Sequence, residues 1–137
     1  GASRLMATRE QFVAAVRSFV RTRVGHMGRT PGAILDCAGV IVCGLRACGD
    51  IVEDVVYGQV PSASVARANA QRLAVEVTSP GLGDVGISVF HDEACHYVVN
   101  VGNGLGVHAR VGNGRVSEEP LDSMRVVSWW KLRCVDG

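Results

Sequence analysis

Two segments of the chain carry apolar residues at helical spacing. In the first, five residues share one stripe at positions i, i+3, i+4, i+7 and i+8: Phe12, Ala15, Val16, Phe19 and Val20. Thr8 and Gln11 precede this stripe at the spacing of a capping box, which predicts that the helix begins at Thr8. The second segment covers 66–73 and predicts another helix, which is the third in chain order and a shorter one. Ser62 or Ser64 is expected as its N-cap.

A different pattern predicts a second helix between these two. Residues 38–47 are apolar almost all round, which indicates a central buried helix rather than a surface one. Asp36 stands before it as a favourable N-cap, and Gly49 follows as a C-cap. The glycines and the proline of 25–32 predict a loop that leads into this helix.

After Pro80 the chain alternates Val, Ile and Phe with small or polar residues, as β-strands do. Five strands are expected, at 85–90, 96–101, 105–111, 115–118 and 126–134. The runs Gly102-Asn103-Gly104 and Gly112-Asn113-Gly114 are strong hairpin turns. Helices followed by an antiparallel sheet predict an α+β domain, and no linker divides the chain.

Composition agrees with one globular domain. The chain has 137 residues, of which 47% are hydrophobic and 20% charged, and its net charge is +1. We expect no nucleic-acid partner, because no basic field is present, and no membrane insertion, because the apolar runs are short. No signal peptide is recognisable, so synthesis in the cytoplasm is expected. We interpret 1–5 as a vector remnant with Met6 as the native start, and 6–137 as one domain.

The odd number of cysteines leaves a candidate reactive thiol. Five are present and none lies in a CxxC motif: Cys37, Cys43, Cys48, Cys95 and Cys134. Cys37 is expected in the first turn of the buried helix, where the helix N-terminus would stabilise a thiolate and lower the thiol pKa. The alternative is a small apolar side chain packed inertly in the core.

A thiolate nucleophile needs a general base, most often histidine. If the first hairpin is centred on Asn103, Val98 faces His108, and His96 and His108 then share one face of the sheet as diagonal neighbours. A slip of one residue would place them on opposite faces. The alternative is two unrelated surface histidines.

Four short motifs, in order, resemble those of the NlpC family of cysteine peptidases. They are Asp36-Cys37-Ala38-Gly39-Val40, Gly83-Asp84-Val85, His96 at the start of a hydrophobic strand, and Gly106-Val107-His108-Ala109. The resemblance runs from about Thr8 to Trp130. It implies a compact papain-like α+β fold, in which N-terminal helices, including the buried helix that carries the nucleophile, pack on an antiparallel sheet.

The resemblance also implies an activity. Cys37 would be the nucleophile, His96 the general base and His108 the residue that orients His96, in a peptidase that cleaves peptidoglycan stem peptides without metal or cofactor. Asp36 would hold a substrate amine, or serve only as the helix cap. His26 would replace the tyrosine that many members have near the oxyanion site.

Two arginines are candidates for contacts with substrate carboxylates. Arg29 and Arg110 suit bidentate recognition, and the alternative is solvated surface charge. The loop His26-Met27-Gly28-Arg29 resembles the phage tail-associated branch of the family. This likeness implies a virion tail or prophage protein that acts on the cell wall, with tail proteins as partners.

Two other hypotheses remain open. One is a catalytically degenerate structural component of a phage tail or similar assembly, with Cys37 buried and inert. The other is a zinc protein that uses Cys37, Cys95, His96 and His108. The run His91-Asp92-Glu93 also suggests metal binding, although adjacent polar residues on a turn are more often solvated.

Overall fold

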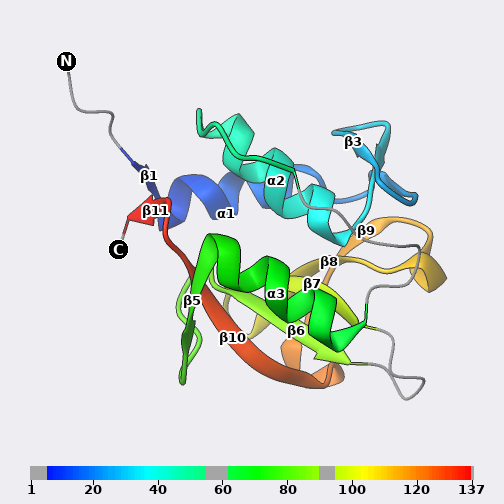
Figure 1. Ribbon diagram of the computed structural model, residues 1–137. Coiled ribbons are helices and arrows are strands. Elements are labelled where there is room, and N and C mark those ends of the chain that lie inside the picture. The colour runs from blue at the N-terminus through cyan, green and yellow to red at the C-terminus, as the bar shows by residue number, and fades with distance from the viewer. Residues whose placement is uncertain (1–5, 55–61, 90–94, 137) are drawn as a thin grey trace.

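The computed structural model describes residues 6–54, 62–89 and 95–136. A six-stranded sheet lies at its centre, and each pair of neighbouring strands is antiparallel. In spatial order its strands are β5 (Ala74–Val77), β10 (Val126–Leu132), β6 (Val85–Val89), β7 (Cys95–Gly102), β8 (Leu105–Ala109) and β9 (Val116–Pro120). Three helices pack against it (Figure 1): α1 (Arg9–Ser18), α2 (Cys37–Ala47) and α3 (Ala63–Leu73). The α+β prediction is confirmed.

The predicted helix starts agree with the structure. The Thr8 hydroxyl accepts from the Gln11 backbone N–H at 3.1 Å, and the Gln11 side chain accepts from the Thr8 N–H at 2.9 Å, which completes the capping box. In α2 every residue from Cys37 to Leu45 is buried, so the prediction of a central buried helix is confirmed. Ser62 caps α3, which at 11 residues is as long as α2 and not shorter.

Short strands complete the fold outside the main sheet. β1 (Ala7–Thr8) and β11 (Val135–Asp136) pair in parallel and bring the two ends of the chain together (Figure 1). β2 (Arg23–Val24), β4 (Ile34–Leu35) and β3 (Arg29–Thr30) form a small sheet beside the start of α2. Among the described residues no helix is long and apolar enough to cross a bilayer.

The main sheet has two different faces. Tyr97 and Val99 of β7 belong to the core that the helices cover, whereas Val98 points to the opposite face, because side chains alternate along a strand. On that outer face Val98 is fully buried beneath residues that include Leu121, Val126 and Trp129. His96 and His108 also belong to this outer face.

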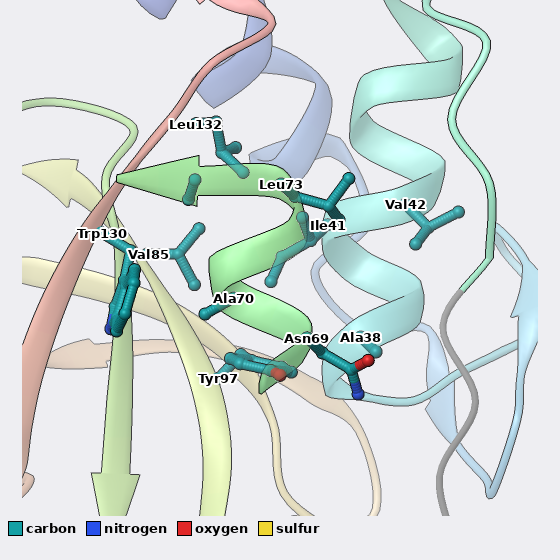
Figure 2. Close-up of a pocket in the computed structure, with 11 residues that line it drawn as sticks. Ala38, Ile41, Val42, Asn69, Ala70, Leu73, Val85, Tyr97, Trp130 and Leu132 are labelled. Atoms are coloured by element: carbon teal, nitrogen blue, oxygen red, sulfur yellow. The ribbon is translucent and has the colours of Figure 1, made fainter. Parts of the chain in front are cut away.

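The helix side of the sheet is closely packed. An apolar cavity of about 30 Å³ lies between α2, α3 and the sheet, lined by residues that include Ile41, Ala70 and Trp130 (Figure 2). The Tyr97 hydroxyl reaches across to donate to the Ala66 carbonyl at 2.7 Å. This cavity has room for little more than water.

Candidate active site

Cys37 is the first residue of α2, directly after the capping Asp36. Its thiol is buried, with 9% of the residue exposed. Hydrogen bonds from the backbone of Tyr97 and of Ala38 reach the sulfur. Because Tyr97 follows His96 in β7, these contacts bring the start of α2 against the strand that carries the histidine.

Burial decides the protonation state of this thiol. The pKa of Cys37 is raised to about 11, chiefly by burial and to a smaller extent by the charge of Asp36. The backbone hydrogen bonds and the charge of Arg29 act in the opposite direction but are outweighed. The sequence predicts a lowered pKa from the helix N-terminus alone, whereas in the folded chain desolvation of the thiolate is the larger effect. The resting thiol is therefore protonated at neutral pH.

His96 and His108 form a buried imidazole pair. Nε2 of His96 lies 2.8 Å from Nδ1 of His108, and the two residues are 6% and 2% exposed. The register pairs Val98 with His108, so the prediction that both histidines share one face of the sheet is confirmed. The alternative of two unrelated surface histidines is wrong. This hydrogen bond engages Nε2 of His96.

A carboxylate extends the pair. Nε2 of His108 lies 3.0 Å from Oε2 of Glu119 on the neighbouring strand β9. The other oxygen of Glu119 accepts from the Asn113 side-chain amide and the Ser117 hydroxyl, both at 3.2 Å. Sequence reasoning missed Glu119, because the strand expected at 115–118 stops one residue short of it. Alternation along that strand was the one signal that could have found it.

Both imidazoles are neutral at neutral pH. The pKa of His96 is lowered to about 3, chiefly by burial and to a smaller extent by the neighbouring His108 and Arg110. Burial also lowers the pKa of His108, although the Glu119 carboxylate acts to raise it. A neutral His96 has a lone pair able to accept a proton, but its low pKa makes it a weak base in the resting site.

An open cleft of about 280 Å³ lies beside the imidazole pair. His96, His108 and Glu119 line it together with Arg110 and Arg125. The cleft therefore combines the candidate base with two cations able to attract a carboxylate, and Cys37 is not among the residues that line it. Arg110 lines the cleft, and its contact with substrate stays a prediction.

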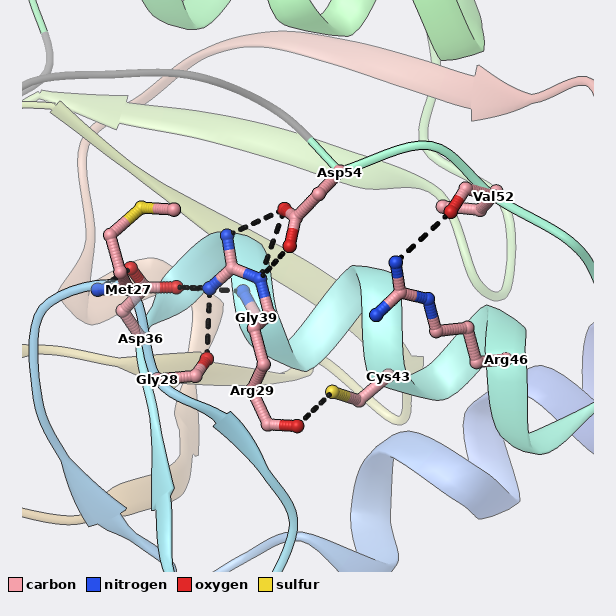
Figure 3. A network of polar contacts seen from close by, with 9 residues as sticks. All are labelled: Met27, Gly28, Arg29, Asp36, Gly39, Cys43, Arg46, Val52 and Asp54. Carbon is pink, nitrogen blue, oxygen red and sulfur yellow. Dashed lines mark hydrogen bonds and ion pairs between the residues drawn. The ribbon is translucent and has the colours of Figure 1, made fainter.

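Arg29 and Asp36 belong to a network that holds the preceding loop on α2 (Figure 3). Arg29 donates from Nη1 to Asp36 at 2.7 Å and to the Gly28 carbonyl at 2.8 Å. Its Nε and Nη2 donate to the Asp54 carboxylate at 2.8–3.0 Å. Its side chain is only 14% exposed, so the alternative of a solvated surface charge is wrong. Besides Arg29, Asp36 accepts from the backbone N–H of Met27 and of Gly39, each at 2.8 Å.

The network gives Asp36 and Arg29 structural partners, and their direct contact with substrate stays a prediction. His26 lies exposed in the same loop, between β2 and β3. Its exposure leaves it accessible to a ligand. Its part in the oxyanion site also stays a prediction.

The zinc hypothesis is wrong in its use of Cys95. Cys95 and His96 are consecutive in β7, so their side chains point to opposite faces, and Cys95 packs in the core. Within 6–54, 62–89 and 95–136, no three His, Cys, Asp or Glu side chains are grouped to hold a metal ion. The run His91-Asp92-Glu93 lies outside the described residues, as do 1–5 and Phe90.

Solved structures with this fold carry the NlpC/p60 name. The NlpC/p60 domain of the peptidoglycan hydrolase SagA superposes with a TM-score of 0.66 at 17% identity, over 92% of this chain and 100% of that one. NlpC2 from Trichomonas vaginalis gives 0.68 at 17% identity, over 94% of this chain. The peptidoglycan hydrolase RipB from Mycobacterium tuberculosis gives 0.66 at 14% identity, also over 94% of this chain.

The chain therefore has the NlpC/p60 fold that its motifs predict. It spans 49% of the length of NlpC2 and 65% of the length of RipB. No protein-family model matches the sequence, and no curated protein matches it either. At identities of 10–17% the likeness establishes the fold, and the activity must be argued from the site.

Proposed function

We propose that this protein is a cysteine peptidase that hydrolyses amide bonds in the stem peptides of peptidoglycan. The observation that carries the proposal is the buried His96–His108 pair, in which His96 lies on β7, the strand whose backbone contacts the Cys37 thiol. Two proteins of the same fold, SagA and RipB, are described as peptidoglycan hydrolases. The cleft with Arg110 and Arg125 suits a substrate that carries carboxylates, as stem peptides do.

The proposed mechanism starts from an uncharged site. His96 accepts the thiol proton at Nδ1 while the thiolate of Cys37 attacks the amide carbonyl carbon. The backbone N–H of Cys37, at the start of α2, would stabilise the oxyanion that forms. His96 then donates its proton to the leaving amine. Water, activated by the same nitrogen, hydrolyses the thioester and restores the thiol.

A virion tail or prophage origin is the second part of the proposal. It is supported by the loop His26-Met27-Gly28-Arg29, which resembles the tail-associated branch. Such a protein would be assembled in the infected cell, with tail proteins as partners, and would act on the wall from outside. Co-purification with tail proteins, or detection of the chain in purified virions of a prophage-bearing strain, tests this part separately.

One observation favours the structural alternative. Cys37 is buried and its pKa is raised to about 11, as expected of an inert core cysteine. A catalytically degenerate tail component would keep the fold and the polar pair but cleave nothing. A single measurement distinguishes the two candidate functions.

That measurement compares the wild type with Cys37→Ala and Cys43→Ala. Cys43 is a matched control, because it is buried in the same helix and its thiol donates to the backbone carbonyl of Arg29 at 3.4 Å rather than to a side chain of the site. Purified peptidoglycans of different stem-peptide composition and their soluble fragments are the substrates, and mass spectrometry detects new amine termini. We expect cleavage by the wild type and by Cys43→Ala, and none by Cys37→Ala. No cleavage by folded wild type would favour the structural alternative, and cleavage by Cys37→Ala would exclude Cys37 as nucleophile.

A further inference from the structure

The carboxylate of Glu119 stands at the end of a chain of three side chains. Glu119 contacts Nε2 of His108, and Nδ1 of His108 contacts Nε2 of His96. Each link spans two neighbouring strands of the sheet, which hold the three groups at fixed separations of 3.0 Å and 2.8 Å. The contacts therefore connect a partly exposed carboxylate to a buried imidazole through a second imidazole.

The positions of the N–H protons on the two imidazole rings follow from these contacts. A neutral imidazole carries one N–H, and an ionised carboxylate only accepts hydrogen bonds. Nε2 of His108 must therefore carry the proton that it donates to Glu119, so that Nδ1 of His108 is an acceptor. Nε2 of His96 must then be the donor to that acceptor, and Nδ1 of His96 carries a lone pair.

We propose that Glu119 is a positioning residue that sets the tautomers of both histidines and so keeps Nδ1 of His96 unprotonated and basic. This inference rests on the proposed function, since it assigns Glu119 a part in the same site. Glu119 is suited to this task, because Asn113 and Ser117 both donate to its other oxygen and fix the plane of the carboxylate. With 38% of its side chain exposed, Glu119 is also in contact with solvent.

The substitution Glu119→Gln reverses the donors and acceptors in the hydrogen bonds that connect residue 119, His108 and His96. Glutamine has one oxygen, and two donors, Asn113 and Ser117, compete for it against the single N–H of His108. The amide nitrogen of the new side chain would then face His108 and donate to Nε2. This donation moves the proton of His108 to Nδ1 and the proton of His96 to its own Nδ1, where it blocks proton acceptance from the thiol.

Nitrogen NMR of the imidazole rings tests this directly, because the two tautomers have different ¹⁵N shifts. In the wild type we expect both histidines to be protonated at Nε2, and in Glu119→Gln both to be protonated at Nδ1. With a cleavable stem peptide, we expect kcat of Glu119→Gln to fall roughly 10-fold to 100-fold with KM within about twofold, as for other outer partners of functional histidines. In a His108→Ala background the same substitution should have no further effect on kcat.

Glu118→Gln is the matched control. Glu118 is the preceding residue of β9, points to the opposite face and forms an ion pair with Arg17 at 2.7 Å. It should leave the tautomers and kcat unchanged. Wild-type tautomers in Glu119→Gln, or a wild-type kcat, would overturn the inference. The NMR measurement needs no substrate, so it decides on Glu119 even if peptidoglycan is not cleaved.

Discussion

At the scale of single residues, Cys37 is subject to two opposing influences. The start of α2 and the backbone hydrogen bonds from Tyr97 and Ala38 favour a thiolate. Desolvation favours the thiol and is the stronger influence, because 9% exposure leaves little water to solvate a charge. Together with the neutral His96, this makes the resting site uncharged, and charge develops only when the substrate is attacked.

The rate at which Cys37 reacts with iodoacetamide should therefore follow a high pKa. We expect slow alkylation at neutral pH and a rate that rises into the alkaline range, with a midpoint near pH 11. Mass spectrometry of the peptide that contains Cys37 measures the rate, and the same peptide labelled in urea supplies the unperturbed midpoint. A plateau at neutral pH would mean a preformed thiolate–imidazolium pair and would contradict the burial argument.

At the scale of elements, Gly39 explains why α2 and the loop before it can approach so closely. A Cβ at this position would collide with the Gly28 carbonyl and press on Arg29 and Asp36. The glycine of the Asp-Cys-Ala-Gly-Val motif therefore serves packing, because it lets the Arg29 network close over the first turn of the nucleophile helix.

Gly39→Ala should lower the free energy of unfolding by about 1–3 kcal/mol, the usual cost of overpacking a buried contact. Urea unfolding followed by circular dichroism measures the change. Gly112→Ala is the control, since the nearest heavy atom to its new Cβ would be 3.8 Å away, and we expect a change within about 0.5 kcal/mol. Equal stability of Gly39→Ala and the wild type would show that the loop moves away freely.

The two hairpins show what sequence reasoning can reach. The first is centred on Asn103, as its turn residues predict, so the placement of His96 and His108 on one face followed from alternation alone. In the second, η1 (Val111–Asn113) forms the turn and pairs His108 with Ser117. A hairpin centred on Asn113 would pair His108 with Glu118 instead. That one-residue difference decides which glutamate reaches the histidine, and the turn residues alone do not determine it.

Other elements lacked any local signal. β5 begins at Ala74, directly after Leu73 ends α3, and no glycine, proline or turn separates them. The strand exists because it pairs with β10, a partner about 55 positions away in the sequence. The β-propensity of single residues carries no information about so distant a contact. The depth at which Cys37 is buried was likewise beyond the sequence, because β7 supplies part of its surroundings.

At the scale of the whole molecule, the buried site couples stability to pH at both ends of the range. His96 has a pKa of about 3 in the folded chain against about 6.5 when unfolded, so the unfolded state binds more protons as the pH falls below 6.5. Cys37 has a pKa of about 11 folded against 9.0 unfolded, so the unfolded state loses its proton first as the pH rises above 9. Both groups are neutral, and folding is most favoured, between these limits.

The free energy of unfolding should thus form a plateau between about pH 6.5 and pH 9 and fall on either side. Each fully titrating group contributes a slope of about 1.4 kcal/mol per pH unit. Urea unfolding across the pH range tests this with two variants, each of which removes one group. His96→Gln should flatten the acid side by one proton's slope and leave the alkaline side unchanged, whereas Cys37→Ala should do the reverse. If either variant keeps the wild-type slopes on both sides, the group it removes is solvated in the folded chain, and the uncharged resting site on which the proposed mechanism depends does not exist.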